Sequence, residues 1–237
     1  MKRKRFAGKG QDFWNKEYKT GTHLAISTNP SEDLQKFARW LEREHGREFL
    51  NQTSTVLDLG CGNGRNLIFL AQNYGLKGLG LDISREAVEQ AKKLSTDLNL
   101  EYKVGSISDV LPVPDRSQSF VLDMMTSHFL NQEQRKKLIS EIDRVLRPGG
   151  WLFLKTFLRD DDVNAERLLK ENPAEEKGSY IHPKIGQAEH VFTEAEIEAS
   201  LSEFFTIEKV TKSHGHLRQG HAFKRRSISV YAQKKIN

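Results

Sequence analysis

The stretch Val56-Leu-Asp-Leu-Gly-Cys-Gly-Asn-Gly-Arg-Asn66 decides the fold of this chain. An apolar run ends there in three glycines at alternate positions, Gly60, Gly62 and Gly64, two residues after Asp58. Glycine lets the backbone turn tightly and approach a ligand where a Cβ would collide. The residues that follow have the apolar character of a helix that packs on a sheet. The stretch therefore predicts the first strand, loop and helix of a βαβ nucleotide-binding unit.

The spacing of the glycines discriminates between nucleotide ligands. The dinucleotide fingerprint is G-x-G-x-x-G, and the first turn of its helix receives a pyrophosphate. Here the pattern is D-x-G-x-G-x-G from Asp58 to Gly64, so the third glycine comes one residue early. A carboxylate at the end of the strand repels phosphate and suits a cationic ligand. A glycine turn that binds no ligand is the structural alternative.

This pattern resembles the first motif of the class I, Rossmann-like S-adenosylmethionine-dependent methyltransferases. The resemblance implies an α/β fold: a Rossmann-like three-layer sandwich around a seven-stranded, mostly parallel sheet whose last strand is antiparallel. It implies S-adenosyl-L-methionine as the cofactor and S-adenosyl-L-homocysteine as its product, because an ammonium and a sulfonium group suit an acidic strand end. It also places the cofactor against Asp58, Gly60, Cys61, Gly62, Asn63 and Gly64.

A second short strand, residues 77–81, ends in Asp82 about twenty residues after the glycine loop. A carboxylate at this position can accept hydrogen bonds from both ribose hydroxyls of the cofactor. Each charge-assisted bond of this kind contributes about 1.5–3 kcal/mol. Ser84 then begins a helix as its N-cap. Without the upstream glycines, Asp82 would be interpreted as a turn or cap residue.

The third strand, residues 101–104, leads to the expected adenine contact. Where the family usually has an aspartate, this chain has Ser106, and the nearest acid is Asp109. Either the serine, a backbone carbonyl or Asp109 would then replace the usual contact with the adenine amino group. Ile83 and Ile107 are predicted to lie on either side of the purine ring, with a purely structural role in the core as the equal alternative.

Residues 111–123 resemble the family's proline-rich turn into the fourth strand, which ends at Asp123. The resemblance places the reacting methyl group at this strand end and Met124 against the cofactor. Residues 141–150 resemble a later motif of the same family. Matching elements occur in the right order over residues 55–157, and this order makes the resemblance specific.

Methyl transfer from a sulfonium is an in-line displacement, so catalysis rests largely on alignment of the nucleophile. A base is required only when the attacking atom carries a proton that must leave early. His128 is the predicted base, with helix capping or packing as the alternative, and Asp123 is predicted to orient an amine or bind a cation. The stretch Asp123-Met-Met-Thr126 lacks the Asn/Asp-Pro-Pro-Tyr motif of exocyclic-amine methylation on bases. A single cysteine excludes covalent pyrimidine C5 methylation by a cysteine pair.

The chain is expected to contain a basic tail and helical cap over residues 1–50 and the methyltransferase domain over residues 51–237. Residues 159–191 are long for a plain connection, which makes them a predicted substrate lid. The resemblance to the family implies that the last strand lies antiparallel between the fifth and sixth. Further predicted elements are helices over residues 12–18, 32–44, 132–146 and from 193 onward, and strands over 151–157, 204–210 and 227–232.

Charge is distributed unevenly along the chain. Residues 1–16 carry six Lys/Arg and one acid, and residues 209–237 carry eight Lys/Arg and no acid. Residues 17–208 have 23 basic and 31 acidic residues, although the whole chain has a net charge of +5. The basic ends either bind nucleic acid or an acidic protein, or are solvated surface. The chain has no 18-residue apolar run and no apolar segment after its basic N-terminus, so we expect a cytoplasmic location and no membrane span. No cysteine and histidine spacing typical of a metal site is present.

The leading prediction is therefore a cytoplasmic methyltransferase that modifies an N, O or S atom of a small-molecule acceptor. The alternative is a protein (lysine or terminal amine) or RNA methyltransferase that holds its substrate with the basic ends. A third possibility is a non-catalytic module that binds the cofactor as a subunit or regulator.

Overall fold

The computed structural model describes residues 7–21, 26–214, 217–218, 221–222 and 224–236. The basic residues before Ala7 lie outside this described part. The chain divides into two compact units, residues 1–107 and residues 108–237. Each unit contributes strands to one sheet of seven strands, in the order β3-β2-β1-β4-β5-β11-β8.

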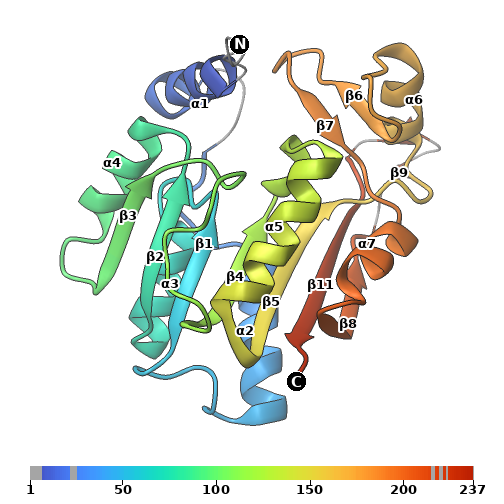
Figure 1. Cartoon of the computed structure of the whole chain (residues 1–237). Coiled ribbons are helices and arrows are strands. Elements are labelled where there is room, and N and C mark those ends of the chain that lie inside the picture. Colours follow the sequence, from blue (N-terminus) through green and yellow to red (C-terminus); the bar gives the residue numbers. More distant parts are fainter. Residues whose placement is uncertain (1–6, 22–25, 215–216, 219–220, 223, 237) are drawn as a thin grey trace, which may run out of the picture. The chain divides into compact units, whose positions relative to one another are not determined.

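The first unit contains a parallel ladder of three strands with helices around it (Figure 1). Val56, Leu57 and Leu59 are fully buried, as expected for a parallel strand that is covered on both faces. Asp58 lies beside Gly80 in the register of the first two strands. The elements are α1 (Ala7–Thr20), α2 (Glu32–His45), β1 (Thr55–Leu59), α3 (Arg65–Tyr74), β2 (Lys77–Asp82), α4 (Arg85–Leu94) and β3 (Leu100–Val104).

The second unit carries the remaining strands of the sheet and two small hairpins. Its elements are β4 (Gln118–Met124), η1 (Ser127–Phe129), α5 (Gln132–Val145), β5 (Leu146–Phe157), α6 (Val163–Glu171), β6 (Ser179–Ile181), β7 (Ala188–His190), α7 (Glu194–Leu201), β8 (Phe205–Lys212), β9 (Leu217–Arg218), β10 (His221–Ala222) and β11 (Ser227–Lys234). Strands β4 and β5 are parallel, and β11 is antiparallel to both β5 and β8. The predicted fold class and the position of the last strand are thus confirmed.

Two helix starts follow the local signals in the sequence. The Ser84 hydroxyl accepts a hydrogen bond from the amide of Ala87, which confirms the predicted N-cap of α4. At α7, Thr193 and Glu196 form a complete capping box. Ser31 occupies the N-cap position of α2, but its side chain makes no capping hydrogen bond.

The segment after α5 differs from expectation. Residues 147–150 were expected to form a turn between a helix and a strand, yet β5 begins at Leu146 and includes them. Leu146 pairs with Gln118 and Trp151 pairs with Phe120, so the additional residues form an irregularity inside the strand. Gly149 has a φ of +72°, a conformation that glycine adopts without the cost of a Cβ.

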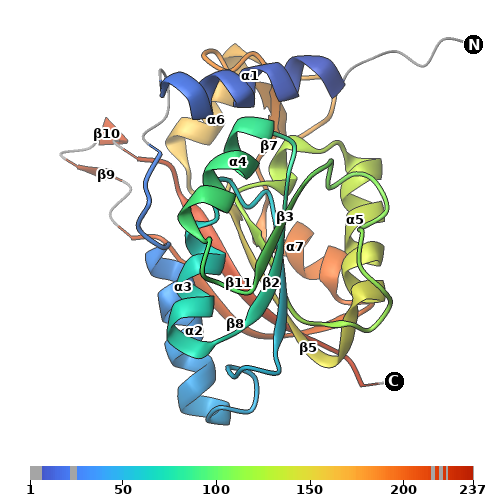
Figure 2. The ribbon, with the colours of Figure 1, turned by 90° about the vertical axis from the view of Figure 1, so that its left-hand side faces the viewer.

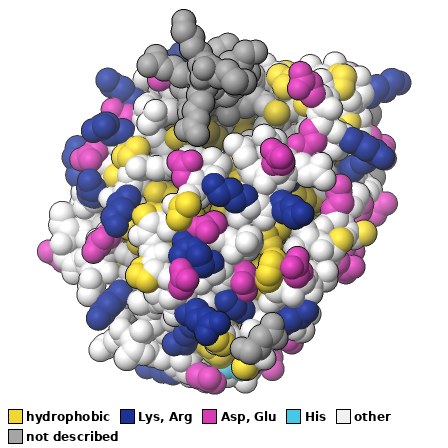
Figure 3. Space-filling model, in the orientation of Figure 1, with side chains coloured by type: hydrophobic (Ala, Val, Ile, Leu, Met, Phe, Trp, Pro, Cys, Tyr) yellow, Lys and Arg dark blue, Asp and Glu magenta, His cyan; other side chains and the backbone are white. Residues whose placement is uncertain are grey.

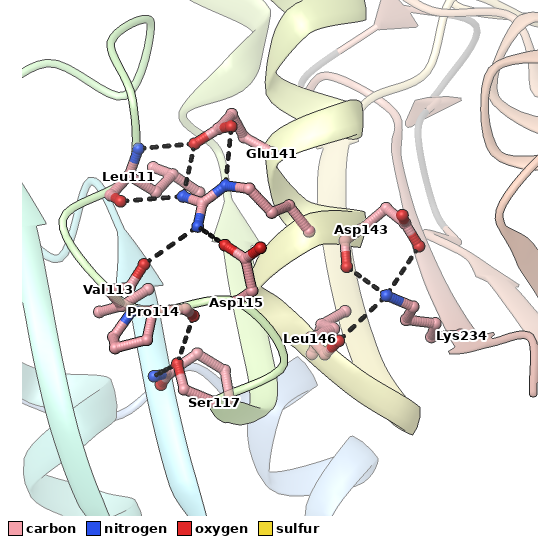
Figure 4. A network of polar contacts seen from close by, with 11 residues as sticks. Leu111, Val113, Pro114, Asp115, Ser117, Glu141, Asp143, Leu146 and Lys234 are labelled. Atoms are coloured by element: carbon pink, nitrogen blue, oxygen red, sulfur yellow. Dashed lines mark hydrogen bonds and ion pairs between the residues drawn. The ribbon is translucent and has the colours of Figure 1, made fainter.

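A polar network connects α5 to the proline-rich turn before β4 (Figure 4). Arg144 donates to Glu141 at 2.7 and 2.9 Å and to Asp115 at 2.6 Å. It also donates to the carbonyl oxygens of Leu111 at 3.0 Å and Val113 at 3.2 Å. All three guanidinium nitrogens of Arg144 therefore bond within the second unit. Through these bonds the end of α5 fixes the turn that leads into β4.

Candidate functional site

The glycine loop has the backbone geometry that its sequence predicts. Gly60, Gly62 and Gly64 have φ values of +70°, +56° and +78°, all in the region that favours glycine. The amides of Gly60 and Cys61 donate to the carbonyl of Leu81 at 2.7 and 3.1 Å. These bonds fix the loop against the end of β2.

Asp82 connects the glycine loop to the start of α4. Its Oδ2 accepts from the amide of Gly62 at 2.8 Å, and its Oδ1 accepts from the amide of Ser84 at 2.8 Å. The side chain is buried, and burial raises the pKa of Asp82 above its ordinary value, while these two hydrogen bonds oppose the rise. A carboxylate has about four lone-pair sites. Asp82 therefore serves as a cap residue and still has acceptor capacity for a diol.

Cys61 packs against β2. Its Sγ lies 2.7 Å from the position that a Cβ on Gly80 would occupy, so residue 80 requires glycine. Burial, and then the nearby carboxylates of Asp58 and Asp82, raise the pKa of the Cys61 thiol. A neutral, buried thiol is a weak nucleophile. This geometry assigns Cys61 a packing position in the loop.

Two asparagines, one in the loop and one in the first turn of α3, hold the segment that precedes α2. Asn63 Nδ2 donates to the carbonyl of Ser27 at 3.1 Å. Asn66 Oδ1 accepts from the amide of Ser31 at 3.1 Å. Asn63 is among the residues predicted to bind the cofactor, and no role is predicted for Asn66 from the sequence. The structure shows that both side chains fix the N-terminal segment to the glycine loop.

Helix α1 lies along the start of α4 (Figure 2). Its side chains bond to that region: Gln11 donates to the carbonyl of Ile83 at 3.0 Å, and Asn15 accepts from the Ser84 hydroxyl at 3.0 Å. Gln90 of α4 donates back to the carbonyl of Tyr18 at 2.6 Å. For residues 12–18 the sequence predicts either packing against the sheet or a cover over the cofactor; these contacts place the helix on α4, and the covering role stays a prediction.

Tyr18 reaches the glycine loop from α1. A Cβ added at Gly62 would collide with the Tyr18 hydroxyl. Burial, and then the charge of Asp82, raise the pKa of Tyr18, so the phenol stays protonated. This contact could not be predicted from the sequence because it depends on the approach of two segments 44 positions apart.

The predicted adenine contacts are only partly enclosed. Ile107 is buried at 7% exposure, and Ile83 and Ser106 are half-buried. Asp109 is exposed. The structure therefore leaves the assignment of the adenine contact as a prediction.

In the second unit, Asp123 supports the turn that follows β4. Its Oδ1 accepts from the amide of Ser127 at 3.1 Å. Burial raises the pKa of Asp123 to about 6. Met124 ends the strand, and Met125 then has a φ of +62°, which is uncommon for a residue with a Cβ. Asp123 thus holds an abrupt turn at the strand end where the reacting group is expected.

His128 lies in η1 and is buried at 2% exposure. Its ring centroid is 4.2 Å from that of Phe129 and 5.3 Å from that of Phe157. Burial lowers the pKa of His128 to about 4, so the imidazole is neutral at pH 7. A group with this pKa is a weak general base near neutrality. Its Nδ1 has no hydrogen-bond partner among the residues that the structure describes.

The predicted lid has structure of its own: α6 and the antiparallel hairpin of β6 and β7. The hairpin carries a buried polar cluster. Tyr180 donates to Glu189, and Arg225 pairs with Glu189 at 2.8 Å. Arg135 of α5 pairs with Glu176, the residue three positions before β6. No local sequence signal predicts this cluster, because Tyr180, Glu189 and Arg225 come from separate segments of the chain.

The comparisons with known proteins agree with this geometry. A family model described as "Methyltransferase domain" matches residues 56–150. The chain is 28% identical over 163 residues to the fatty-acid O-methyltransferase of Mycolicibacterium smegmatis, covering 68% of this chain and 58% of that protein. It is 28% identical over 172 residues to the tRNA (carboxymethyluridine(34)-5-O)-methyltransferase of Arabidopsis thaliana, covering 72% and 39%.

Among solved structures, a SAM-dependent methyltransferase from Methanosarcina mazei is similar to this chain with a TM-score of 0.68 and 28% identity. The match covers 81% of this chain and 97% of that structure. By contrast, the chain spans 58% and 39% of the lengths of the two relatives above.

Proposed function

Because the chain belongs to the class I family of S-adenosylmethionine-dependent methyltransferases, we propose that it methylates a nucleophilic N, O or S atom of a small molecule. S-Adenosylmethionine is the cofactor of this family and supplies an activated methyl group. The transfer is an in-line displacement in which the acceptor atom attacks the methyl carbon and the sulfonium leaves as a neutral thioether. The protein's part is to position the acceptor and exclude water.

The observation that carries this proposal is the position of Asp82. The buried carboxylate is held by the amides of Gly62 and Ser84 and keeps acceptor capacity. A Cβ at Gly62 would collide with the Tyr18 hydroxyl and one at Gly64 with the Tyr102 hydroxyl, so the loop keeps this conformation only with glycine at both positions. Together with the buried carboxylate of Asp58, these groups fit a ligand that has a cationic amino-acid end and a ribose diol.

A small acceptor is supported by the lid. Residues 159–191 contain α6 and the β6–β7 hairpin, whose polar cluster is buried, so this insertion has an ordered structure of its own. We propose the lid role for residues 159–191, with residues 1–50 as tail and cap and residues 51–237 as the methyltransferase domain. The fatty acid and the carboxymethyl group in the relatives' names are both carboxyl compounds, which suggests an acceptor of the same class.

We propose a cytoplasmic location because the free thiol of Cys61 is compatible with a reducing compartment. Within the described part of the chain, no helix has the length and apolar character needed to span a membrane.

A macromolecular acceptor is the second candidate, and the basic character of residues 209–237 favours it. One of the two relatives named above is a tRNA methyltransferase. Against it, basic and acidic side chains are interspersed over the face shown in Figure 3, whereas nucleic-acid binding uses a continuous basic patch.

The test uses purified protein, methyl-labelled S-adenosylmethionine and a cell extract separated into metabolite, protein and nucleic-acid fractions. We expect label in the metabolite fraction, undiminished when residues 1–10 are deleted. Label in protein or RNA that is lost with this deletion would replace the small-molecule proposal with the macromolecular one.

Asp82→Ala is the cofactor-site control and should abolish transfer into every fraction. If wild-type protein binds S-adenosylhomocysteine tightly but labels no fraction, the chain is a non-catalytic module.

A further inference from the structure

Arg225 lies two residues before β11, and only part of its guanidinium is paired. Its Nη1 donates to Glu189 at 2.8 Å and to the hydroxyl of Tyr180. Its Cζ lies 3.5 Å from the centroid of the Phe157 ring. Its Nε and Nη2 are buried and have no hydrogen-bond partner among the described residues.

These two nitrogens form one edge of the guanidinium. The N–H groups of Nε and Nη2 point in the same direction and match the two oxygens of a carboxylate, as in a bidentate ion pair. Burial of charged donors without an acceptor costs free energy, and proteins rarely leave such donors unpaired unless the position has a use. The Nε–Nη2 edge of Arg225 therefore offers two aligned donors for the two oxygens of a carboxylate.

His128 provides an independent observation at the same place. Its ring and the Arg225 guanidinium both pack on Phe157. The His128 side chain is buried at 2% exposure, and its Nδ1 is also without a partner among the described residues. Two unpartnered buried polar groups thus share one aromatic ring.

The charge of the surroundings limits the ligand. Glu189 already pairs with Arg225, and Arg135 pairs with Glu176. Because one positive charge is shared between Glu189 and a ligand, a monoanion is favoured over a dianion such as a phosphate ester. Glu189 and Tyr180 belong to the β6–β7 hairpin and bond to Nη1, so the hairpin leaves the Nε–Nη2 edge of Arg225 unbonded.

We propose that the Nε–Nη2 edge of Arg225 binds the carboxylate of the methyl acceptor, beside His128. This inference rests on the proposed small-molecule function and narrows the acceptor to carboxylic acids. It also gives the lid a chemical role, since hairpin residues hold Arg225 in position from one side while the acid binds on the other edge.

The test measures binding by calorimetry to the full chain saturated with S-adenosylhomocysteine. The probes are matched pairs, octanoate with octanamide and benzoate with benzamide, together with phenyl phosphate. We expect the acids to bind about tenfold or more tightly than their amides and phenyl phosphate to bind more weakly than benzoate.

Three variants separate the subsite from general effects. Arg225→Lys keeps the charge opposite Glu189 but loses the fork, so it should reduce acid affinity to the level of the amide. Glu189→Gln removes the competing carboxylate and should strengthen acid binding. Arg116→Lys is the control, because Arg116 is exposed in the turn before β4 and lies outside residues 159–191, and it should change nothing.

Two results would overturn the subsite: no acid binds more tightly than its amide, or Arg225→Lys binds acids as well as the wild type does. Thermal unfolding of each variant identifies any that fails to fold, and Glu189→Gln then supplies the second test. Label in the metabolite fraction with no acid preference would reject the subsite alone. Label in RNA or protein would reject the proposed function whatever the calorimetry shows.

Discussion

Replacement of Asp82 by asparagine tests the central feature of the cofactor site. In the wild type, the two carboxylate oxygens accept from two different amides, those of Gly62 and Ser84, each at 2.8 Å. Asparagine has one acceptor oxygen and one NH₂ group. One of the two amides would therefore face a donor in place of an acceptor.

The expected loss has two parts. A hydrogen bond to a charged group contributes about 1.5–3 kcal/mol, and a buried donor left unsatisfied costs about 1–3 kcal/mol. Asparagine is uncharged, so the variant avoids the cost of burying a carboxylate, the same cost that raises the pKa of Asp82. This offsets some of the loss, and we expect a net destabilisation of about 2–3 kcal/mol. For a chain of this size, that corresponds to a fall in Tm of about 4–12 °C.

Cofactor binding should weaken as well. The variant loses one of the two acceptors proposed for the ribose hydroxyls, which predicts an affinity for S-adenosylhomocysteine about 10- to 100-fold lower. Calorimetric titration measures this affinity, and differential scanning calorimetry without ligand measures Tm. Asp97→Asn is the matched control, because Asp97 is an exposed aspartate of the same unit and should change neither quantity.

The stability and affinity results refute different steps. An unchanged Tm would show that the two amides do not depend on the carboxylate. A lowered Tm with unchanged cofactor affinity would leave Asp82 as a cap residue alone and remove its ribose role.

Three further substitutions test other parts of the structure. Asp123→Asn keeps an acceptor for the Ser127 amide but cannot ionise. Burial raises the pKa of Asp123 from 3.8 to about 6. Ionisation of the buried carboxyl destabilises the folded wild type, so the stability that the protonated carboxyl contributes is complete below pH 3.8 and is lost as pH rises through 6. In urea unfolding, the free energy of unfolding of the variant relative to that of the wild type should therefore be about 3 kcal/mol higher at pH 8 than at pH 3.5. Gly64→Ala combines a φ of +78° with a Cβ that collides with the Tyr102 hydroxyl, so thermal unfolding should show a loss of about 2–4 kcal/mol. Arg144→Lys keeps the charge but loses most of five hydrogen bonds, and urea unfolding should show a loss of about 2–3 kcal/mol with unchanged cofactor affinity.

Each of these has an outcome that contradicts it. A difference between Asp123→Asn and the wild type that does not vary with pH would mean that Asp123 titrates normally. Wild-type stability in Gly64→Ala would mean that the loop accommodates a methyl group. A loss in Arg144→Lys no larger than in Arg167→Lys, a control at an exposed arginine of α6 that pairs with Glu171, would show that the network at α5 does not contribute to stability.

Much of the fold could be predicted because its signals are local. The alternating glycines after an apolar strand indicated a positive-φ loop, and φ values of +56° to +78° confirm that conformation. The Ser84 cap and the Thr193 capping box depend on residues within three positions of each other. The start of β5 was misplaced because a proline and two glycines usually end an element, whereas pairing of Leu146 with Gln118 extends the strand across them.

The sequence by itself determined the glycine loop, the acidic strand ends and the alternation of strands and helices, because each follows from backbone preference and hydrophobic periodicity over a few residues. Only the tertiary structure decided which side chains meet. Tyr18 approaches Gly62 across 44 positions, and Arg225 pairs with Glu189 across 36. No local preference encodes such contacts, since they result from the packing of whole elements. The same packing buries an edge of Arg225 that has no partner among the described residues, and this is the edge that we propose for an acid.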